Sequence, residues 1–500
     1  MCPHRCTALS VVILTRPTRF RWVYCQLEAL RHCIPSSVRH ILGELPESLD
    51  ETYERVLREI NKANREHAHR LLQCLTVASR PLRVAELAEV LAVDFSTASG
   101  GEASKLKTDW RWEDQEDAIL STCSSLIALV DGDEDASRVV RPSHSHSSRA
   151  VQFSHFSVKK FLTSPRLSTS TADVSRFHIF LAPAHTIMAW ACLGTLLQLD
   201  DTSDKGGVEG KLPVARYAAE HWVTHAQFEE VSPHVREGMK ILFDPDKPYF
   251  SAWIRIYDFD IKPSTTSTFR LFSVRVSDAT PLYYAALCGF HGIVEHLINK
   301  CSQGVNNIGG RYVSPLVAAL EMGHFEVAEL LCRHGAHVDV RGYWKCTPLW
   351  NASRKGHLEI VRWLLRHGAD PNLWDEPYGR TALYEAARRG ILEVAQTLLQ
   401  HNADPNIQDS KGQTPLHGAS KNGNGEVVRL LLEQGVEVNA RKKDGSTPLH
   451  LASEDGYLEV ARVLIEHGAD RDAEDNKGRT PFQVAENRDM AELLSDDSSK

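Results

Sequence analysis

The chain has 500 residues, 42% of them hydrophobic, and a formal net charge of −8 at pH 7. This length and apolar content suffice for about three domains, and the acidic balance argues against a nucleic-acid-binding protein. No stretch approaches the roughly 18 consecutive apolar residues of a membrane-spanning helix. Eleven cysteines are scattered without paired spacing, which predicts a reducing compartment and a cytoplasmic location.

One short phrase returns seven times between residues 280 and 482. It consists of Thr or Ser, then Pro (once Ala), then Leu or Phe, and its copies begin at Thr280, Ser314, Thr347, Thr381, Thr414, Thr447 and Thr480. Successive copies are 33 or 34 residues apart. A constant period of this length indicates a solenoid, in which each unit buries its apolar face against its neighbours.

The spacing inside each unit predicts two helices. Thr or Ser can cap the first helix, and the Pro that follows has no amide hydrogen to leave unpaired. A first stop stands nine residues after the cap, at Gly289, Gly323, Gly356, Gly390, Gly423 and Gly456. A second stop stands at Gly335, Gly368, Asn402, Gly435 and Gly468. Asn is the next-best residue after Gly for a left-handed helix end, so the second stop is present in each of the five middle units.

These units resemble the ankyrin repeat. The residues that carry the resemblance are Thr414-Pro415-Leu416-His417 with Ala419 and Thr447-Pro448-Leu449-His450 with Ala452. The resemblance implies a mainly α protein that ends in an ankyrin-repeat α-solenoid of seven repeats over residues 280–495. The first and last units depart from the pattern and are interpreted as end caps.

Residues 20–165 are predicted to form a helical and winged-helix domain. Leu49, Tyr53 and Leu57 share one helical face, and further helices lead to two short strands, the second of which runs from Val151 to His155. Ser157 is expected to cap the next helix. Helices followed by a β-hairpin are typical of a winged helix.

The other boundaries follow from changes in periodicity. Residues 166–262 are predicted as a helical segment and residues 263–279 as a tether into the repeats. Residues 1–19 form an unmatched leader, whose apolar run is short for a secretory signal and lacks a small-residue cleavage site. Residues 141–150, rich in Ser and His, are expected to be a disordered loop extension. The roles of the leader and of this loop stay open.

Beyond the repeats, the chain resembles fungal signalling receptors of the NACHT/STAND (NLR-like) class. Their order is a NACHT nucleoside-triphosphatase module, a winged helix, a helical segment and ankyrin repeats. The matching stretches are residues 20–30, 45–55, 80–90 and 153–162. The resemblance implies an interaction scaffold or sensor arm that recognises a partner protein in the ankyrin groove.

The sequence shows no sign of the nucleoside-triphosphatase module of that class. No G-x-x-x-x-G-K-[ST] phosphate-binding loop occurs, so no cofactor is expected. A gene-model truncation, a split gene and a paralogue without the module all remain open, and the alternative function is a fragment of a signalling NTPase whose NACHT module lies upstream or on another chain. His155 matches a winged-helix His that contacts ADP in the wider family, which makes it an orphan nucleotide-sensing position or, alternatively, a structural residue.

No catalytic or metal site is predicted. His221 and His225 are spaced to share one helix face, but the Glu of an H-E-x-x-H zinc motif does not follow His221, and packing is the favoured interpretation. His144 and His146 lack partners at ligand spacing. A hydrolase is a third alternative, but no G-x-S-x-G nucleophile motif occurs.

Two groups of residues in the repeats are predicted to bind a partner. The first is aromatic and comprises Tyr343, Trp344, Trp350, Trp374, Tyr378 and Tyr384. The second is basic and comprises Arg354, Lys355, Arg388, Arg389 and Lys421. Aromatic anchors beside a basic stripe favour a protein partner with an acidic segment, with solvated helix ends as the alternative. Neither the partner's identity nor the oligomeric state follows from the sequence.

Overall fold

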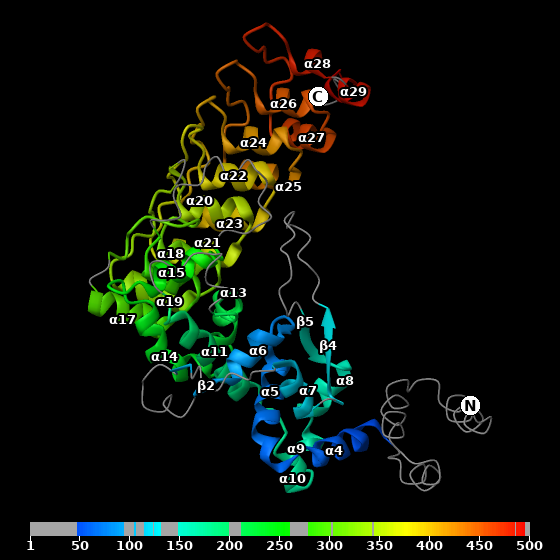
Figure 1. Cartoon of the computed structure of the whole chain (residues 1–500). Helices are drawn as coiled ribbons and strands as arrows, with labels where there is room; N and C mark the ends of the chain where they lie inside the picture. Colours follow the sequence, from blue (N-terminus) through cyan, green and yellow to red (C-terminus); the bar gives the residue numbers. More distant parts are fainter. Residues whose placement is uncertain are drawn as a thin grey trace, which may run out of the picture. The chain divides into compact units, whose positions relative to one another are not determined.

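The structure is a computed structural model that describes residues 48–94, 105–106, 115–123, 125–131, 149–199, 212–260, 279–301, 304–342, 345–485 and 487–495 (Figure 1). The chain divides into two compact units, Met1–Lys262 and Pro263–Lys500. Among the described residues, no helix is both long and apolar enough to cross a membrane.

Helices make up most of the described part of the first unit. In chain order they are α4 (Leu49–Glu59), η2 (Lys62–Asn64), α5 (Arg65–Val77), α6 (Val84–Leu91), α7 (Gln115–Cys123), α8 (Phe156–Leu162), α9 (Pro165–Ser168), α10 (Ala172–Ser175), α11 (Leu181–Leu196), α13 (Ala215–Ala226), α14 (Val231–Leu242) and α15 (Tyr249–Ile256). The helical face predicted around Tyr53 and Leu57 is buried in α4. The prediction of a mainly helical chain is confirmed.

Two small antiparallel sheets accompany these helices. The larger has the order β1-β5-β4, formed by β1 (Leu82–Arg83), β4 (Ile127–Asp131) and β5 (Arg149–Phe153). In this sheet Leu82 pairs with Val151, and Ile127 pairs with Phe153. The smaller sheet joins β2 (Val93–Asp94) to β3 (Lys105–Leu106). The hairpin predicted after the helices is therefore present, with its second strand ending at Phe153 instead of His155.

His155 has a structural role at the start of α8. The helix begins at Phe156, and the Nδ1 atom of His155 accepts a hydrogen bond from the Ser157 amide at 3.2 Å. The hydroxyl of Ser157 lies 2.6 Å from the same ring nitrogen and 2.8 Å from the hydroxyl of Tyr53 on α4. Ser157 therefore lies inside the helix, and the cap expected from Ser157 is provided by His155.

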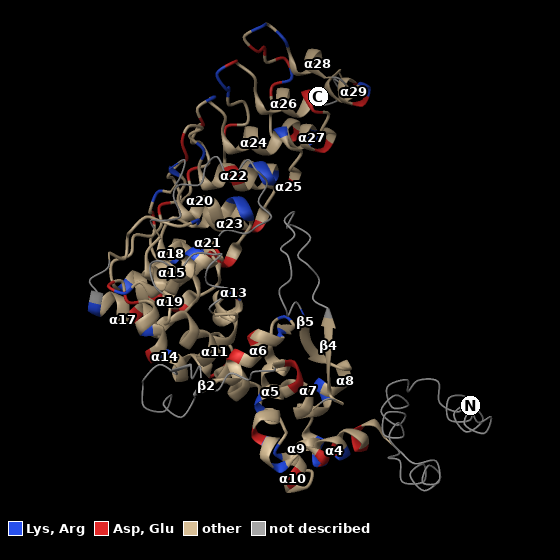
Figure 2. Cartoon of the chain, in the orientation of Figure 1, with Lys and Arg blue, Asp and Glu red and all other residues tan. Residues whose placement is uncertain are grey.

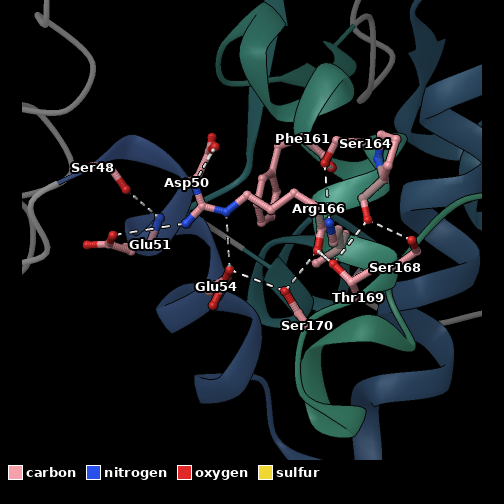
Figure 3. Close-up of polar contacts among 12 residues, drawn as sticks. Ser48, Asp50, Glu51, Glu54, Phe161, Ser164, Arg166, Ser168, Thr169 and Ser170 are labelled. Atoms are coloured by element: carbon pink, nitrogen blue, oxygen red, sulfur yellow. Dashed lines mark hydrogen bonds and ion pairs between the residues drawn. The ribbon is translucent and has the colours of Figure 1, made fainter.

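Arg166 attaches α9 to the first turns of α4 (Figure 3). Its Nη1 donates to the Asp50 carboxylate at 3.1 Å, while Glu51 and Glu54 lie 4.0 and 3.9 Å from the guanidinium. Ser170 also donates to Glu54, at 3.3 Å. One guanidinium thus serves three carboxylates that would otherwise repel one another on one helix end.

One member of the His pair of the helical segment, His225, is part of a buried hydrogen-bond chain. His225 on α13 is fully buried, and its Nε2 lies 2.9 Å from the hydroxyl of Tyr217. The Ser79 amide donates to that hydroxyl at 3.2 Å, whereas the neighbouring His221 packs against the Tyr217 ring at a centroid distance of 4.8 Å. His144 and His146 lie outside the described residues, and no group of three or more potential metal ligands occurs within them.

Pairs of antiparallel helices make up the second unit. The pairs are α16 (Pro281–Leu287) with α17 (His291–Cys301), α18 (Pro315–Glu321) with α19 (Phe325–Arg333), α20 (Pro348–Lys355) with α21 (Leu358–Arg366), α22 (Ala382–Arg389) with α23 (Leu392–Gln400), α24 (Pro415–Lys421) with α25 (Gly425–Glu433), α26 (Pro448–Glu454) with α27 (Leu458–Glu466), and α28 (Pro481–Val484) with α29 (Arg488–Ser495). Figure 1 shows them following one another from green to red.

The start and stop signals act as the sequence predicts. Thr381, for example, caps α22 by accepting a hydrogen bond from the Tyr384 amide at 3.2 Å. Glycines at both kinds of stop have positive φ, and Asn402, the single non-glycine among the second stops, has φ +64°. Ala386 and Ala387 on α22 are fully buried, which allows neighbouring helices to approach closely.

Candidate protein-binding surface

The loop between α21 and α22 carries two exposed aromatic side chains. Trp374 and Tyr378 are 48% and 50% exposed. The loop is held in place by a bridge from Trp374 to Thr381 and by the Asp375 carboxylate, which accepts a hydrogen bond from the Arg380 amide at 2.6 Å. We refer to residues 374–380 as the aromatic finger. Its side chains are available to a partner on a loop whose backbone is fixed.

Arg380 connects this finger to α22. Its guanidinium carbon lies 4.9 Å from the centre of the Tyr378 ring and 5.1 Å from that of Tyr384. The same side chain donates to the Glu385 carboxylate at 3.2 Å. A cation held against two aromatic faces and a carboxylate stiffens the finger.

Trp350 and Tyr384 are buried, unlike Trp374 and Tyr378. They are 7% and 2% exposed, so the expectation that they are free for recognition is corrected. Both stand directly after the three-residue phrase, at what we call the fourth phrase position, where His417 and His450 are also buried. At that position the side chain packs inside the stack, and burial raises the pKa of Tyr384 to about 12.

Side chains at the fourth phrase position reach the loop 29 residues further along the chain. The Tyr384 hydroxyl donates to Gln413 at 3.3 Å, and the Nε2 atoms of His417 and His450 lie 3.3 and 2.9 Å from the carbonyl oxygens of Ser446 and Arg479. Trp350 is an exception, because its indole nitrogen finds no hydrogen-bond partner within the described residues. The aromatic replacement of His is thus chiefly a structural feature.

A buried carboxylate neutralises part of the predicted basic group. Glu385 is 1% exposed and lies 2.8 Å from Arg388 and 3.5 Å from Arg389. Burial acts to raise the pKa of Glu385, but the hydrogen bond and charge of Arg388, with the charges of Arg380 and Arg389, lower it overall. The carboxylate is therefore ionised and orients three guanidinium groups.

The remaining basic residues differ in their surroundings. Lys355 forms an ion pair with Glu321 at 2.7 Å, and the guanidinium of Arg354 lies 5.5 Å from the centre of the Trp350 ring. Lys421 is exposed at the end of α24. The basic residues are thus present at successive first helices, but most of them are engaged within the stack instead of forming an open stripe.

Tyr343 and Trp344 lie outside the described residues. His155 belongs to the first unit, whereas this surface belongs to the second. Sequence reasoning missed Arg380 and Glu385, which organise the aromatic finger and the arginines of α22. A Glu two residues after the repeated phrase at Thr381, in a unit with three nearby Arg, was the signal available for them.

Comparison with known proteins identifies the repeats. The family model described as "Ankyrin repeats (3 copies)" matches residues 265–342, 337–409, 388–475 and 416–500. The chain therefore contains ankyrin repeats, as the sequence analysis predicted. Such repeats point to a non-catalytic, protein-binding role for the second unit.

Two curated relatives are similar to the chain. Azaphilone pigments biosynthesis cluster protein L of Monascus ruber is 31% identical over 312 residues, which cover 59% of this chain and 61% of that protein. A fem-1 homologue of Drosophila melanogaster is 35% identical over 77 residues, which cover 14% of this chain and 12% of that protein. The chain thus spans less than two thirds of the length of either relative. The second unit, residues 263–500, is less than half of the chain, whereas the alignment with the Monascus protein covers 59% of it. The similarity to that protein therefore extends into the first unit.

Proposed function

We propose that the chain is a protein-interaction scaffold, the sensor arm of a fungal NLR-like signalling receptor, with no catalysis of its own. The observation that carries this proposal is the aromatic finger, where Trp374 and Tyr378 are about half exposed on a braced loop of an ankyrin-repeat unit. Ordered aromatic side chains provide much of the binding energy at protein interfaces and lose little conformational entropy when they bind.

The architectural part of the proposal assigns each of the seven helix pairs in the described residues to one ankyrin repeat. It also assigns α5, α6 and α7 with the β1-β5-β4 sheet to a winged helix, which the antiparallel hairpin after the helices supports. The predicted domains at 20–165, 166–262 and 280–495, with a tether at 263–279, are part of the same proposal. A cytoplasmic location accompanies it.

A point of contact with the partner is proposed at the aromatic finger and the nearby basic side chains of α20, α22 and α24. Purification of the chain from cells of its source organism would identify bound proteins, and the reconstituted pair would then be titrated with purified variants. Trp374→Ala with Tyr378→Ala should weaken binding at least about tenfold, since each is expected to contribute on the order of 1 kcal/mol or more.

A matched control is available on the second helix of the preceding pair. Arg362 and Arg366 of α21 are exposed, so Arg362→Ala with Arg366→Ala removes two large side chains from a helix that is not part of the finger. Equal affinities for wild type and the aromatic double variant, with both proteins folded, would refute the proposed surface. So would an equal loss in the control.

The alternative function is a fragment of a signalling NTPase that works with a separate NACHT module. It is supported by the position of His155 beside a sheet and helix cap, although that ring is already engaged by Ser157. Calorimetric titration of the purified chain with ADP and ATP tests it. Saturable binding that is lost in His155→Ala would favour the alternative over the scaffold.

A further inference from the structure

The loops before the last three helix pairs carry more cations than exposed anions. Residues 408–413, 441–446 and 474–479 contain six Lys or Arg and four Asp or Glu. Two of the four acids, Asp409 and Asp475, are buried at 6% exposure. Figure 2 shows the blue of Lys and Arg on these loops, in the part of the chain coloured orange and red in Figure 1. We call Lys411, Arg441, Lys443 and Lys477, which are all exposed, the basic finger row.

Backbone hydrogen bonds join these loops to one another. The Lys443 amide donates to the carbonyl oxygen of Lys411 at 2.9 Å, and the Asn476 amide donates to that of Asp444 at 2.9 Å. A Cβ atom on Gly412, which has φ +75°, would lie only 2.9 Å from the Lys443 nitrogen. The loops therefore touch through their backbones, and the side chains at their tips are held in register.

This register places like charges next to one another. Lys411 and Lys443 are joined across the loops by that backbone bond, and no carboxylate of the described residues lies within ion-pair distance of Lys411, Lys443 or Lys477. Arg441 donates to the carbonyl oxygen of Glu474 at 2.7 Å. Adjacent like charges on paired backbones are unfavourable, so these lysines are not explained by the stability of the stack.

Several other cations of the same unit are compensated. Lys355 pairs with Glu321, Arg388 with Glu385, and Lys442 with Asp444. Lys411, Lys443 and Lys477 differ from these three cations in charge compensation. An anionic group bound across two loops would relieve the repulsion between Lys411 and Lys443.

We propose that the basic finger row binds an acidic, extended segment of a partner protein across the loops before α24, α26 and α28. This inference rests on the proposed function. It places the acidic segment of the partner at the finger tips instead of at Arg388 and Arg389, whose charge Glu385 neutralises in part. A protein segment is favoured over nucleic acid because the chain carries a net charge of −8, which would repel a long polyanion beyond the short row.

A fluorescein-labelled decaglutamate peptide tests the proposal on the full chain by fluorescence polarisation. Wild type is expected to bind it at low salt and to bind it more weakly at 0.3 M salt, because exposed charges are screened. Lys411→Gln with Lys443→Gln should weaken binding about tenfold, as expected for two exposed charge pairs. The unfolding midpoint of this double variant should equal that of wild type or exceed it, because the repulsion between Lys411 and Lys443 is removed.

Three comparisons decide the outcome. Arg362→Gln with Arg366→Gln removes two charges from α21 and should leave peptide affinity unchanged. No binding of decaglutamate by wild type, an equal loss in this control, or tighter binding of a 20-residue oligouridylate than of decaglutamate would each overturn the proposal. Because Trp374→Ala with Tyr378→Ala should not affect decaglutamate, failure of the aromatic surface and failure of the basic row are distinguishable.

Discussion

The Nδ1 atoms of His185 on α11 and His225 on α13 lie 2.9 Å apart. The hydroxyl of Tyr217 accepts a hydrogen bond from the Ser79 amide, and its own proton can be donated to Nε2 of His225. In that arrangement His225 is neutral and donates from Nδ1 to Nδ1 of His185. A further proton on Nδ1 of His185 or on Nε2 of His225 would set two donors against each other, so this chain of hydrogen bonds requires both rings to be neutral.

Acidification is therefore predicted to destabilise the first unit. Burial lowers the pKa of His225 to about 3, with smaller effects from the charges of His185 and His221, whereas an unfolded His titrates near pH 6.5. Below pH 6.5 the unfolded chain takes up a proton that the folded chain refuses, so stability should fall as the pH drops from 6.5 towards 3, by a few kcal/mol in total.

Urea unfolding at pH 7.0, 6.0 and 5.0, followed by tryptophan fluorescence, measures this loss. His225→Gln is the comparison, because it removes the titrating group from the buried site. Wild type should lose more stability than His225→Gln over this range. Identical pH slopes for the two proteins would contradict the role assigned to His225.

Glu385 should be among the most sensitive polar residues of the second unit. Glu385→Ala leaves Arg380, Arg388 and Arg389 without the buried carboxylate that they surround, and removal of one partner from such a cluster costs about 3–5 kcal/mol. Glu359→Ala breaks an exposed pair with Arg362 and should cost at most about 0.5 kcal/mol. Urea midpoints of the two variants test the difference, and similar midpoints would refute it.

Asn402 should accept glycine but not a branched residue. Its φ of +64° is in the left-handed region, where β-branched side chains are strained. Asn402→Val is expected to cost about 1–3 kcal/mol, whereas Asn402→Gly should be neutral or slightly stabilising. Gln400→Ala on the exposed side of α23 serves as the control. Thermal unfolding with equal midpoints for Val and Gly at position 402 would exclude this backbone strain.

Buried alanines should not tolerate larger side chains. Ala352 and Ala386 are 1% and 0% exposed, and leucine at either position should overpack the stack and cost about 1–3 kcal/mol. Ala403 lies between two helices but is also buried, at 5%, so Ala403→Leu should be destabilising too. Ala473→Leu, in a partly exposed turn, is the control for denaturant midpoints. A midpoint equal to wild type for Ala386→Leu would contradict the packing.

The helix ends of the second unit were predictable because a left-handed backbone restricts residue type. Glycine at most stops and Asn402 at the remaining one signal the conformation directly. The partners of Glu385 were not predictable in the same way, since Arg380 comes from a loop whose spacing follows no helical period. His155 was missed as a cap because imidazole is uncommon at that position, while Ser157 has the usual residue type.

Burial at the fourth phrase position was misjudged for a different reason. Trp350 and Tyr384 replace His417-like residues, and a large aromatic in place of a small polar ring suggested an added surface function. The aligned His is itself buried, so the position belongs to the interior whatever occupies it. Whether a charged side chain has an oppositely charged partner depends on three-dimensional contacts, so the periodic pattern alone could not show which charges are compensated.

The contact of Tyr384 with Gln413 determines where this array can be cut and rejoined. The first helix α22 depends on Gln413 in the loop 29 residues downstream of Tyr384 and on Arg380 in the loop before it, so a transplantable module extends from the aromatic finger to Gln413. A segment of the same phase that ended at Asn406 would bring Tyr384 without its acceptor and leave a hydroxyl in an interior site unpaired. When repeats are exchanged, the loop that contains Gln413 should therefore be kept with α22, which precedes it, and not with α24, which follows it.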